Sequence, residues 1–178
     1  MQFSFEKSID NIPKPCYNKA YQMKGGYPMK LTLIFDMDGT IADLYKVENW
    51  LAKLRKFDPS PYTEAALMVQ GVAEAIAKVR NAGAEVKVVS WLSKESNADY
   101  DKEVRKAKHE WLKAQGIEVD SVRCVPYGKQ KAYYRNPENI NILFDDNAEV
   151  RESFEGFPMC FAIDPNAVDM VEVLEGLL

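Results

Sequence analysis

Short apolar segments alternate with helical patterns from Lys30 onward, and this alternation constrains the fold more than any other feature of the chain. Each apolar segment has large apolar residues at both odd and even positions, which is typical of strands covered on both faces. The expected strands are 31–36, 86–90, 121–125, 140–145 and 159–163. The expected helices are 71–82, 96–115 and 165–178. This order predicts an α/β fold with a Rossmann-like, doubly wound parallel sheet.

The composition of the 178 residues fits one domain, in which 47% of the residues are hydrophobic and 28% are charged. Residues 1–29 show no periodic pattern and hold prolines, glycines and scattered aromatics, so we interpret them as an N-terminal extension of a core at 30–178. No apolar run reaches the ~18 residues of a membrane span, and charged residues stand near the N-terminus where a signal peptide is apolar. We therefore expect no membrane contact.

The cysteines and the histidine exclude several kinds of chemistry. Cys16, Cys124 and Cys160 are far apart and form neither a zinc spacing nor a disulfide framework, which favours a reducing, cytoplasmic location. The single histidine, His109, argues against mechanisms with a histidine base or a histidine metal cluster. It lies between charged neighbours in an expected helix, and we expect it to be exposed and inert.

Charged and hydroxyl side chains stand where three of the expected strands end. Asp36 and Asp38 mark the end of the first strand, Ser90 ends the second, and Asp145 and Asp146 close the fourth. In an open parallel sheet, ligands bind beyond the carboxyl ends of the strands. We therefore expect these side chains to meet in one site.

The carboxylates of this site need positive partners, because acidic groups at close range repel each other. The segment GKQKA supplies Lys129 and Lys131, and Gly39 allows the backbone to turn tightly beside a ligand. Carboxylates, a hydroxyl and a lysine suit a hard divalent cation together with a phosphate group. The sequence therefore predicts a Mg²⁺ site and a small phosphorylated substrate.

In the segments LIFDMDGT, VVS, GKQKA and FDD, the chain resembles the haloacid dehalogenase-like (HAD) phosphohydrolases, whose four motifs follow the same order. Ser90 resembles the second motif, Lys131 or Lys129 the third, and 144–146 the fourth. The resemblance covers residues 30 to about 165 and implies an HAD core. Within that family, the stretch VVSWLS…EVRKAKHEWLKAQG is similar to deoxyribonucleotidases and to small phage- or bacteria-associated phosphatases.

The resemblance implies a Mg²⁺-dependent phosphomonoesterase. Asp36 would be the nucleophile that forms an aspartyl-phosphate, and Asp38 would protonate the leaving oxygen and then activate water. Ser90 would hydrogen-bond a phosphate oxygen, and Lys131, or Lys129 as the alternative, would stabilise the transition-state charge. An acid at position 38 favours phosphatase over dehalogenase chemistry, since a halide leaves unprotonated.

The resemblance also implies two ligand sets. The metal would be held by Asp36, by Asp38 through its backbone carbonyl, and by Asp145 or Asp146. The residues expected to bind the phosphate are Met37, Gly39, Thr40, Ser90 and Lys129.

HAD proteins select substrates with insertions between the first and second motifs, and here about residues 43–69 remain for a small helical cap insertion. We expect an amphipathic helix at 45–56 and a second short helix at 62–70. The first helix carries Lys46, Lys53, Arg55 and Lys56 near Trp50. This pattern indicates either base stacking with phosphate attraction or a solvated basic face with Trp50 in the core.

The main hypothesis is therefore a phosphatase of a small metabolite, with a nucleotide foremost. A phosphatase acting on nucleic-acid ends is a second hypothesis, against which the net charge of −4 counts. A phospho-signalling receiver also uses clustered aspartates, but its motifs follow a different order. A non-catalytic HAD-fold binding or scaffold protein is the remaining alternative.

Overall fold

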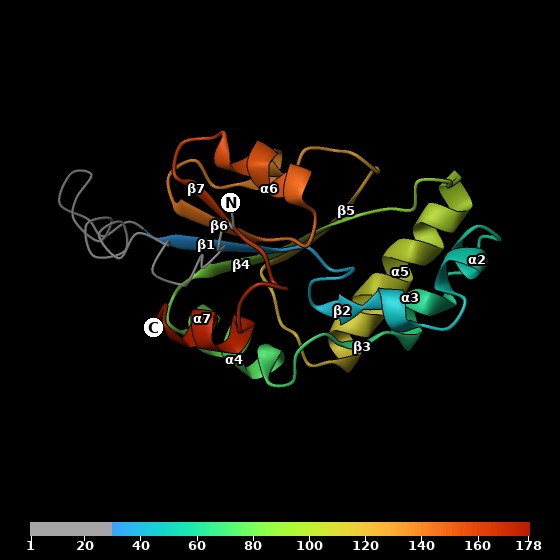
Figure 1. The fold of residues 1–178 in the computed structure, drawn as a ribbon, viewed down its shortest axis with the longest axis horizontal. Coiled ribbons are helices and arrows are strands. Elements are labelled where there is room, and N and C mark those ends of the chain that lie inside the picture. The colour runs from blue at the N-terminus through green and yellow to red at the C-terminus, as the bar shows by residue number, and fades with distance from the viewer. Residues whose placement is uncertain (1–29) are drawn as a thin grey trace, which may run out of the picture.

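The computed structural model describes residues 30–178, so the expected extension at 1–29 lies outside the described residues. Its main sheet has five parallel strands in the order β5-β4-β1-β6-β7 (Figure 1). Their bounds are β1 Leu31–Phe35, β4 Glu85–Trp91, β5 Ser121–Val125, β6 Ile140–Phe144 and β7 Cys160–Ile163. The predicted parallel α/β sheet is confirmed, and each predicted strand agrees with an observed one to within one residue at either end.

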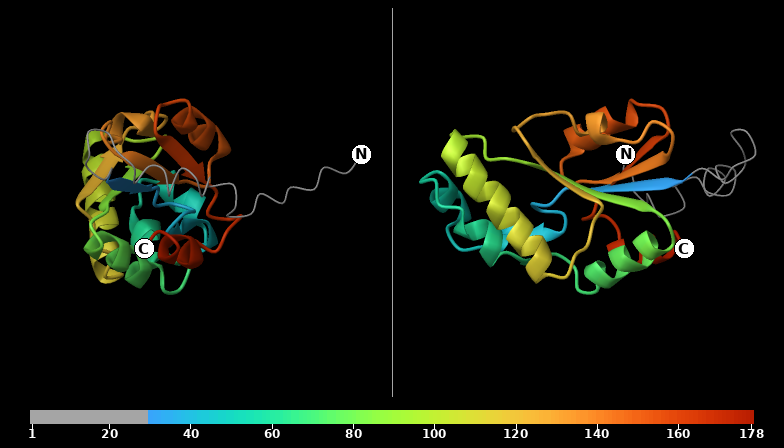
Figure 2. Two further views of the ribbon diagram at one scale, coloured as in Figure 1. Left: turned by 90° about the vertical axis from the view of Figure 1, so that its left-hand side faces the viewer. Right: turned by 180° about the vertical axis from the view of Figure 1, so that it is seen from behind.

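Helices cover both faces of this sheet (Figures 1 and 2). Helices α4 (Val72–Asn81) and α7 (Met170–Glu175) pack together on one face, and α6 (Ala148–Glu155) and the short 3-10 helix η3 (Lys131–Tyr134) lie on the other. A separate apolar cluster fills each face, because alternate residues of the buried strands point to opposite sides. No helix among residues 30–178 is long and apolar enough to cross a membrane.

Asparagine and aspartate side chains begin three of the helices. Asn97 accepts hydrogen bonds from two backbone N–H groups of the first turn of α5 (Ala98–Ala114). Asn147 does the same for α6, and Asp169 for α7. Such caps satisfy N–H groups that have no partner inside the helix. Helix α7 is therefore shorter than the predicted helix 165–178, because its cap lies at Asp169.

The segment after β1 differs from the two helices predicted for it. It contains β2 (Ala42–Asp43), the 3-10 helix η2 (Leu44–Lys46), α2 (Trp50–Leu54), α3 (Ser60–Glu64) and β3 (Ala66–Leu67). The predicted helix 45–56 is interrupted at Asn49, whose φ of 56° is left-handed. Helix α3 begins before the predicted position because proline is tolerated in a first helical turn, here at Pro61.

We call the segment from β2 to β3 the helical segment. Its helix α3 packs on α5, and a third apolar cluster joins them. The cluster includes Leu44, Leu54, Tyr62, Leu92, Tyr100, Val104 and Ala107. The helical segment and α5 therefore form one packed unit at the carboxyl ends of the strands (Figure 1). The assignment of this segment as a substrate-selecting cap stays a prediction.

The sheet core predicts a large difference between two aromatic substitutions. Phe144 is fully buried and its ring stacks on Phe35 with centroids 4.7 Å apart, whereas Tyr133 is 63% exposed. We expect Phe144→Ala to lower the free energy of unfolding by about 3–5 kcal/mol, because it leaves a cavity between two central strands. Tyr133→Ala should change it by less than about 0.5 kcal/mol. Urea unfolding measures both values, and equal losses would contradict this description of the core.

Candidate active site

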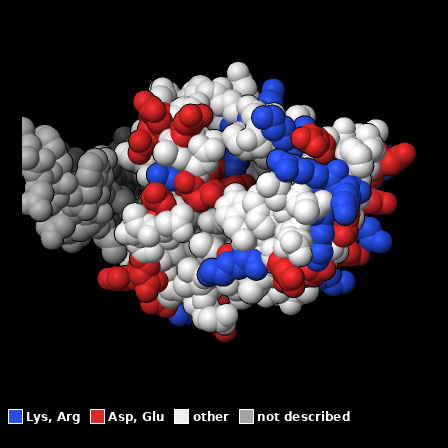
Figure 3. Space-filling model, turned by 45° about the vertical axis from the view of Figure 1, so that its right-hand side comes forward, with Lys and Arg blue, Asp and Glu red and all other residues white. Residues whose placement is uncertain are grey.

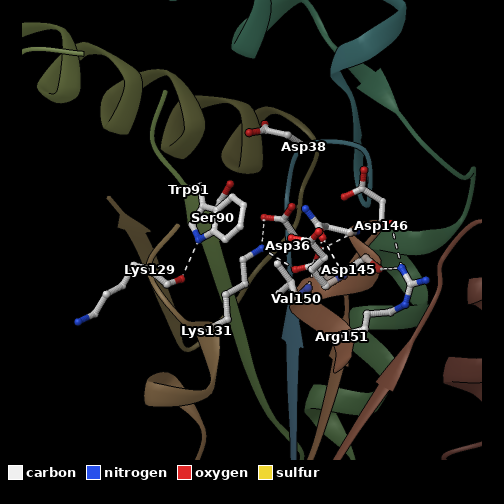
Figure 4. Close-up of polar contacts among 12 residues, drawn as sticks. Asp36, Asp38, Ser90, Trp91, Lys129, Lys131, Asp145, Asp146, Val150 and Arg151 are labelled. Atoms are coloured by element: carbon white, nitrogen blue, oxygen red, sulfur yellow. Dashed lines mark hydrogen bonds and ion pairs between the residues drawn. The ribbon is translucent and has the colours of Figure 1, made fainter. Parts of the chain in front are cut away.

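Side chains from three neighbouring strands meet at the carboxyl edge of the sheet. Strand β1 is central: the chain runs from it to β4 and β5 on one side and then crosses to β6 and β7 on the other. Ligands bind at such a switch point in open α/β sheets. Asp36 follows β1, Ser90 lies near the end of β4, and Asp145 follows β6. Figure 4 shows these side chains around one space, with Lys131 reaching toward Asp36.

The loop after β1 is held in a tight turn. The carbonyl of Met37 accepts hydrogen bonds from the N–H groups of Thr40, Ile41 and Ala42 at 3.3, 3.1 and 2.8 Å. Gly39 has a φ of +78°, which favours glycine. A Cβ atom on Gly39 would also stand 2.6 Å from a carboxylate oxygen of Asp146. A larger residue would therefore push apart the two ends of the site.

Three carboxylates are close enough to share a metal ion. One oxygen each of Asp36, Asp145 and Asp146 lies within 4.8 Å of the other two. Burial, followed by the charge of Asp36, raises the pKa of Asp145, and the same two causes raise the pKa of Asp146 to about 6. Crowded, poorly hydrated oxygen ligands of this kind fit a hard divalent cation such as Mg²⁺.

Lys131 balances part of this negative charge. Its Nζ is 2.8 Å from Asp36 Oδ1 and 2.6 Å from Asp145 Oδ2, and the side chain is 1% exposed. Burial alone would lower the pKa of Lys131, but the charges of the two aspartates outweigh burial and raise it. Three carboxylates and one ammonium leave two negative charges in the cluster. A divalent cation would neutralise them.

Only one of the two candidate lysines lies in this cluster. The side chain of Lys129 is exposed, extends away from the carboxylates (Figure 4) and places its Nζ 4.8 Å from the centroid of the Tyr133 ring. The Lys129 carbonyl accepts a hydrogen bond from Trp91 Nε1 at 2.8 Å, which fixes the backbone with the side chain outward. The structure therefore does not bring Lys129 to the expected phosphate position.

Asp38 is directed away from the carboxylate trio and meets a residue that the sequence analysis missed. Lys108 of α5 places its Nζ 2.5 Å from Asp38 Oδ2 and 2.7 Å from Ser90 Oγ. Burial raises the pKa of Asp38, the charge of Lys108 opposes this effect, and the charge of Asp36 adds to it. The pKa of Asp38 is raised despite its ion pair with Lys108. The Asp38 side chain is not among the potential metal ligands found within residues 30–178.

The sequence did contain a signal for Lys108. Val104, Ala107 and Trp111 form the buried stripe of α5, and Lys108 lies on the same face at helical spacing. The expectation of exposure holds for the neighbouring His109, which is exposed and forms a contact of 2.7 Å between its Nδ1 and the Arg105 carbonyl. A lysine inside an apolar stripe is a buried charge in need of a partner.

The expected phosphate-binding loop uses its backbone in two ways. The N–H groups of Gly39 and Thr40 donate within the loop, to the carbonyls of Ala42 and Met37. The N–H groups of Met37 and Asp38 donate to no acceptor within the described part of the chain. These two N–H groups, with Ser90 Oγ, are the donors that remain for a phosphate oxygen.

Arg151 is a second residue that the sequence analysis missed. It donates to the carbonyls of Asp145 and Asp146 at 2.8 and 2.9 Å and pairs with Asp164 Oδ2 at 2.7 Å. Asn147 N–H donates to Asp145 Oδ1 at 3.0 Å. These contacts hold the two consecutive aspartates at the end of β6, so that both side chains face the site.

A cavity of about 340 Å³ opens beside Asp36 and Asp38. Two aromatic pairs lie on its wall: Tyr45 with Trp50, whose ring centroids are 5.1 Å apart, and Trp91 with Tyr127, at 4.9 Å. Arg55 and Lys94 also line this cavity. Figure 3 shows Lys and Arg side chains gathered over the helical end of the molecule. Trp50 is partly buried on the cavity wall. It is therefore not a fully buried core residue, and part of its ring faces the cavity, where a base could stack.

The five-stranded parallel sheet, in the order β5-β4-β1-β6-β7, has an HAD-like core fold that it shares with several solved structures. No family model and no curated protein matches the sequence. The fold is similar to that of D,D-heptose 1,7-bisphosphate phosphatase from B. bronchiseptica, solved with magnesium and phosphate (15% identity, TM-score 0.53), with 84% of this chain and 98% of that chain covered. A HAD-like phosphatase from Mesorhizobium loti, described as putative, is also similar (19% identity, TM-score 0.50, 84% and 88% covered).

A chain of the Pnkp1/Rnl/Hen1 RNA repair complex matches with 16% identity and a TM-score of 0.54. The match covers 76% of this chain and 42% of the RNA-repair chain, so this protein spans less than half the length of that relative. These likenesses show the fold. The narrower resemblance to deoxyribonucleotidases stays a prediction.

The carboxylate trio predicts that magnesium stabilises the fold. An ion at 100 times its dissociation constant contributes about 2.7 kcal/mol, which corresponds to a rise of about 5–10 °C in Tm for a chain of this size. We expect Asp146→Asn to remove most of this rise, because it removes one charged oxygen ligand. Asp99→Asn, at a side chain that is 91% exposed, should leave the rise unchanged. Thermal unfolding with magnesium or with EDTA measures the shift, and no difference between the two would contradict a metal site.

Proposed function

We propose that this protein is a magnesium-dependent phosphomonoesterase in which Asp36 forms a covalent aspartyl-phosphate. The observation that carries the proposal is the separation of two aspartates two residues apart. Asp36 forms an ion pair with Lys131, whereas Asp38 lies beside Ser90 and Lys108 with its pKa raised. One carboxylate is thus suited to attack and the other to proton transfer.

In the first half-reaction, a carboxylate oxygen of Asp36 attacks phosphorus, and the bond from phosphorus to the leaving oxygen breaks. Asp38 transfers its proton to that oxygen, so the product leaves as an alcohol. The N–H groups of Met37 and Asp38, together with Ser90, hold phosphate oxygens. Lys131 keeps Asp36 in position and offsets the charge that develops around phosphorus.

In the second half-reaction, Asp38 takes a proton from a water molecule, whose oxygen attacks phosphorus and releases phosphate from Asp36. A magnesium ion bound by Asp36, Asp145 and Asp146, with the Asp38 carbonyl as a further ligand, would supply charge neutralisation at the carboxylates and the phosphate. Arg151 and Asn147 keep Asp145 and Asp146 in place.

Hydrolysis of p-nitrophenyl phosphate tests this reaction. We expect magnesium-dependent turnover that Asp36→Asn lowers by at least about 10³-fold, because the covalent step is lost. Lys131→Met should lower kcat by about 10²-fold or more, since it removes the ammonium beside the nucleophile. The matched change Lys129→Met should alter kcat by less than about threefold. If the protein hydrolyses no phosphomonoester, the result would favour a non-catalytic binding or scaffold protein instead.

The substrate class that we propose is a nucleotide. The leaving group would enter the cavity beside Asp38, where the Tyr45–Trp50 and Trp91–Tyr127 pairs offer aromatic surfaces for a planar base. Arg55 and Lys94 line the same cavity, together with Glu95, and offer cationic groups to the phosphate of such a ligand. The volume of about 340 Å³ lies in the range of small-molecule sites.

A phosphate group at the end of a nucleic acid is the second candidate substrate. The gathering of Lys and Arg over the helical end of the molecule favours it, because such side chains attract a phosphate backbone (Figure 3). One of the similar folds also belongs to an RNA repair complex. The net charge of −4 for the whole chain counts against this candidate.

Trp50 provides the test of the substrate. We expect Trp50→Ala to raise KM for a nucleoside monophosphate by about 10-fold, since base stacking contributes about 1–3 kcal/mol. KM for glycerol phosphate should stay nearly unchanged, and Tyr133→Ala, outside the cavity, should affect neither substrate. Steady-state kinetics with both substrates measure these values, and equal effects of Trp50→Ala on the two would contradict stacking.

An oligonucleotide with a terminal phosphate separates the two candidates in the same assay. The second candidate requires a kcat/KM above that of the mononucleotide and a steep fall with added salt, because backbone contacts release counterions. A kcat/KM below that of the mononucleotide would exclude it.

A further inference from the structure

Lys108 is the buried charged group that the mechanism above leaves without a role. It belongs to α5, yet it reaches the ends of β1 and β4, and its side chain is 0% exposed. The Tyr62 ring covers its ammonium group, with Nζ 4.6 Å from the ring centroid. An unpaired ammonium at such depth is costly, so the groups around it decide what it does.

All three N–H bonds of Lys108 are directed to this protein's own atoms. Nζ is 2.5 Å from Asp38 Oδ2, 2.7 Å from Ser90 Oγ and 3.0 Å from the Trp91 carbonyl. An ammonium has three donors and no acceptor, so none remains for a substrate oxygen. Lys108 therefore acts through its neighbours.

The contact with Asp38 leaves one particular oxygen free. Lys108 holds Oδ2, whereas Oδ1 is buried and has no hydrogen-bond partner within residues 30–178. Asp38 also lines the cavity that would receive the leaving group. Oδ1 is thus the oxygen of Asp38 that Lys108 leaves without a hydrogen-bond partner within the described residues.

The contact with Ser90 has a similar effect. Because Lys108 donates to Ser90 Oγ, the hydroxyl proton of Ser90 is directed elsewhere. Within residues 30–178, Ser90 Oγ makes no hydrogen bond other than the one that it accepts from Lys108. The hydroxyl can therefore donate to a phosphate oxygen, while its own oxygen is held from behind.

We propose that Lys108 is a positioning residue, which aligns Asp38 for proton transfer and Ser90 for phosphate binding by holding both from the side opposite the substrate. This inference rests on the proposed function. It makes α5, packed against the helical segment, part of the catalytic apparatus, because the acid on the β1 loop is held by a residue 70 positions further along the chain.

The dependence on the leaving group tests this role. Nitrophenolate leaves without help from an acid, whereas an alkoxide requires a proton. With magnesium present, we expect Lys108→Met to keep a burst of nitrophenolate of about one per enzyme, formed within about 10-fold of the wild-type rate. Aspartyl-phosphate formation from an alkyl phosphate should slow by about 10²-fold or more. Rapid-quench kinetics measure both steps.

Three further variants complete the test. Asp38→Asn should show the same pattern, and the double variant with Lys108→Met should be no slower than Asp38→Asn alone, because both changes remove one function. Lys106→Met, an exposed lysine on the same helix, should behave as the wild type. If Lys108→Met does not fold, Lys108→Gln, which keeps two N–H donors but has less reach, takes its place in the comparison.

Two results would overturn the proposal: equal slowing of both substrates by Lys108→Met, or losses in the double variant that multiply. A purely structural lysine would produce the first result together with a lower Tm. Failure of the proposed function is distinguishable, because the wild type would then hydrolyse no p-nitrophenyl phosphate, or Asp36→Asn would leave its turnover unchanged.

Discussion

The ion pairs of Lys131 with Asp36 and Asp145 are the interactions on which the site depends. Parallel strands bring three carboxylates to one edge of the sheet, at distances where their mutual repulsion would force them apart or neutralise them. The buried ammonium of Lys131 offsets part of this repulsion but does not neutralise all three carboxylates. The two remaining negative charges suit a divalent cation and, with it, a phosphate group. The charges of Lys131 and the three aspartates thus stabilise this edge of the sheet and also favour a cationic ligand there.

The turn at Gly39 gives two neighbouring aspartates different environments. Asp36 lies at the end of β1 beside Lys131, whereas Asp38, within the turn that follows, contacts Lys108 of α5. Their charges are therefore compensated by different lysines, from η3 and from α5. An acid and a nucleophile need opposite protonation states at the same pH, and burial raises the pKa of Asp38 against the opposing charge of Lys108.

The helical segment connects this chemistry to substrate choice. It is short, and beside the apolar cluster that it forms with α5 lies a cavity lined by aromatic, aliphatic and charged side chains. The lysine that holds Asp38 lies under the same cluster, beneath Tyr62. Under the proposed function, the residues that would shape the leaving-group cavity and the lysine that would align the acid thus belong to one packed unit.

Local patterns in the sequence determined the strands and the acidic residues at their ends. Strands with apolar residues at both parities are buried on both faces wherever they lie, and Asp36, Asp145 and Asp146 follow such strands directly. Only the tertiary structure decided between Lys129 and Lys131, because two lysines within one turn differ only in which one faces the sheet. It also decided the partners of Lys108 and the broken helices at 44–64, since both depend on contacts between α5 and segments far away in the chain. Periodicity is a property of neighbours along the sequence, whereas the partner of a buried charge is set by packing.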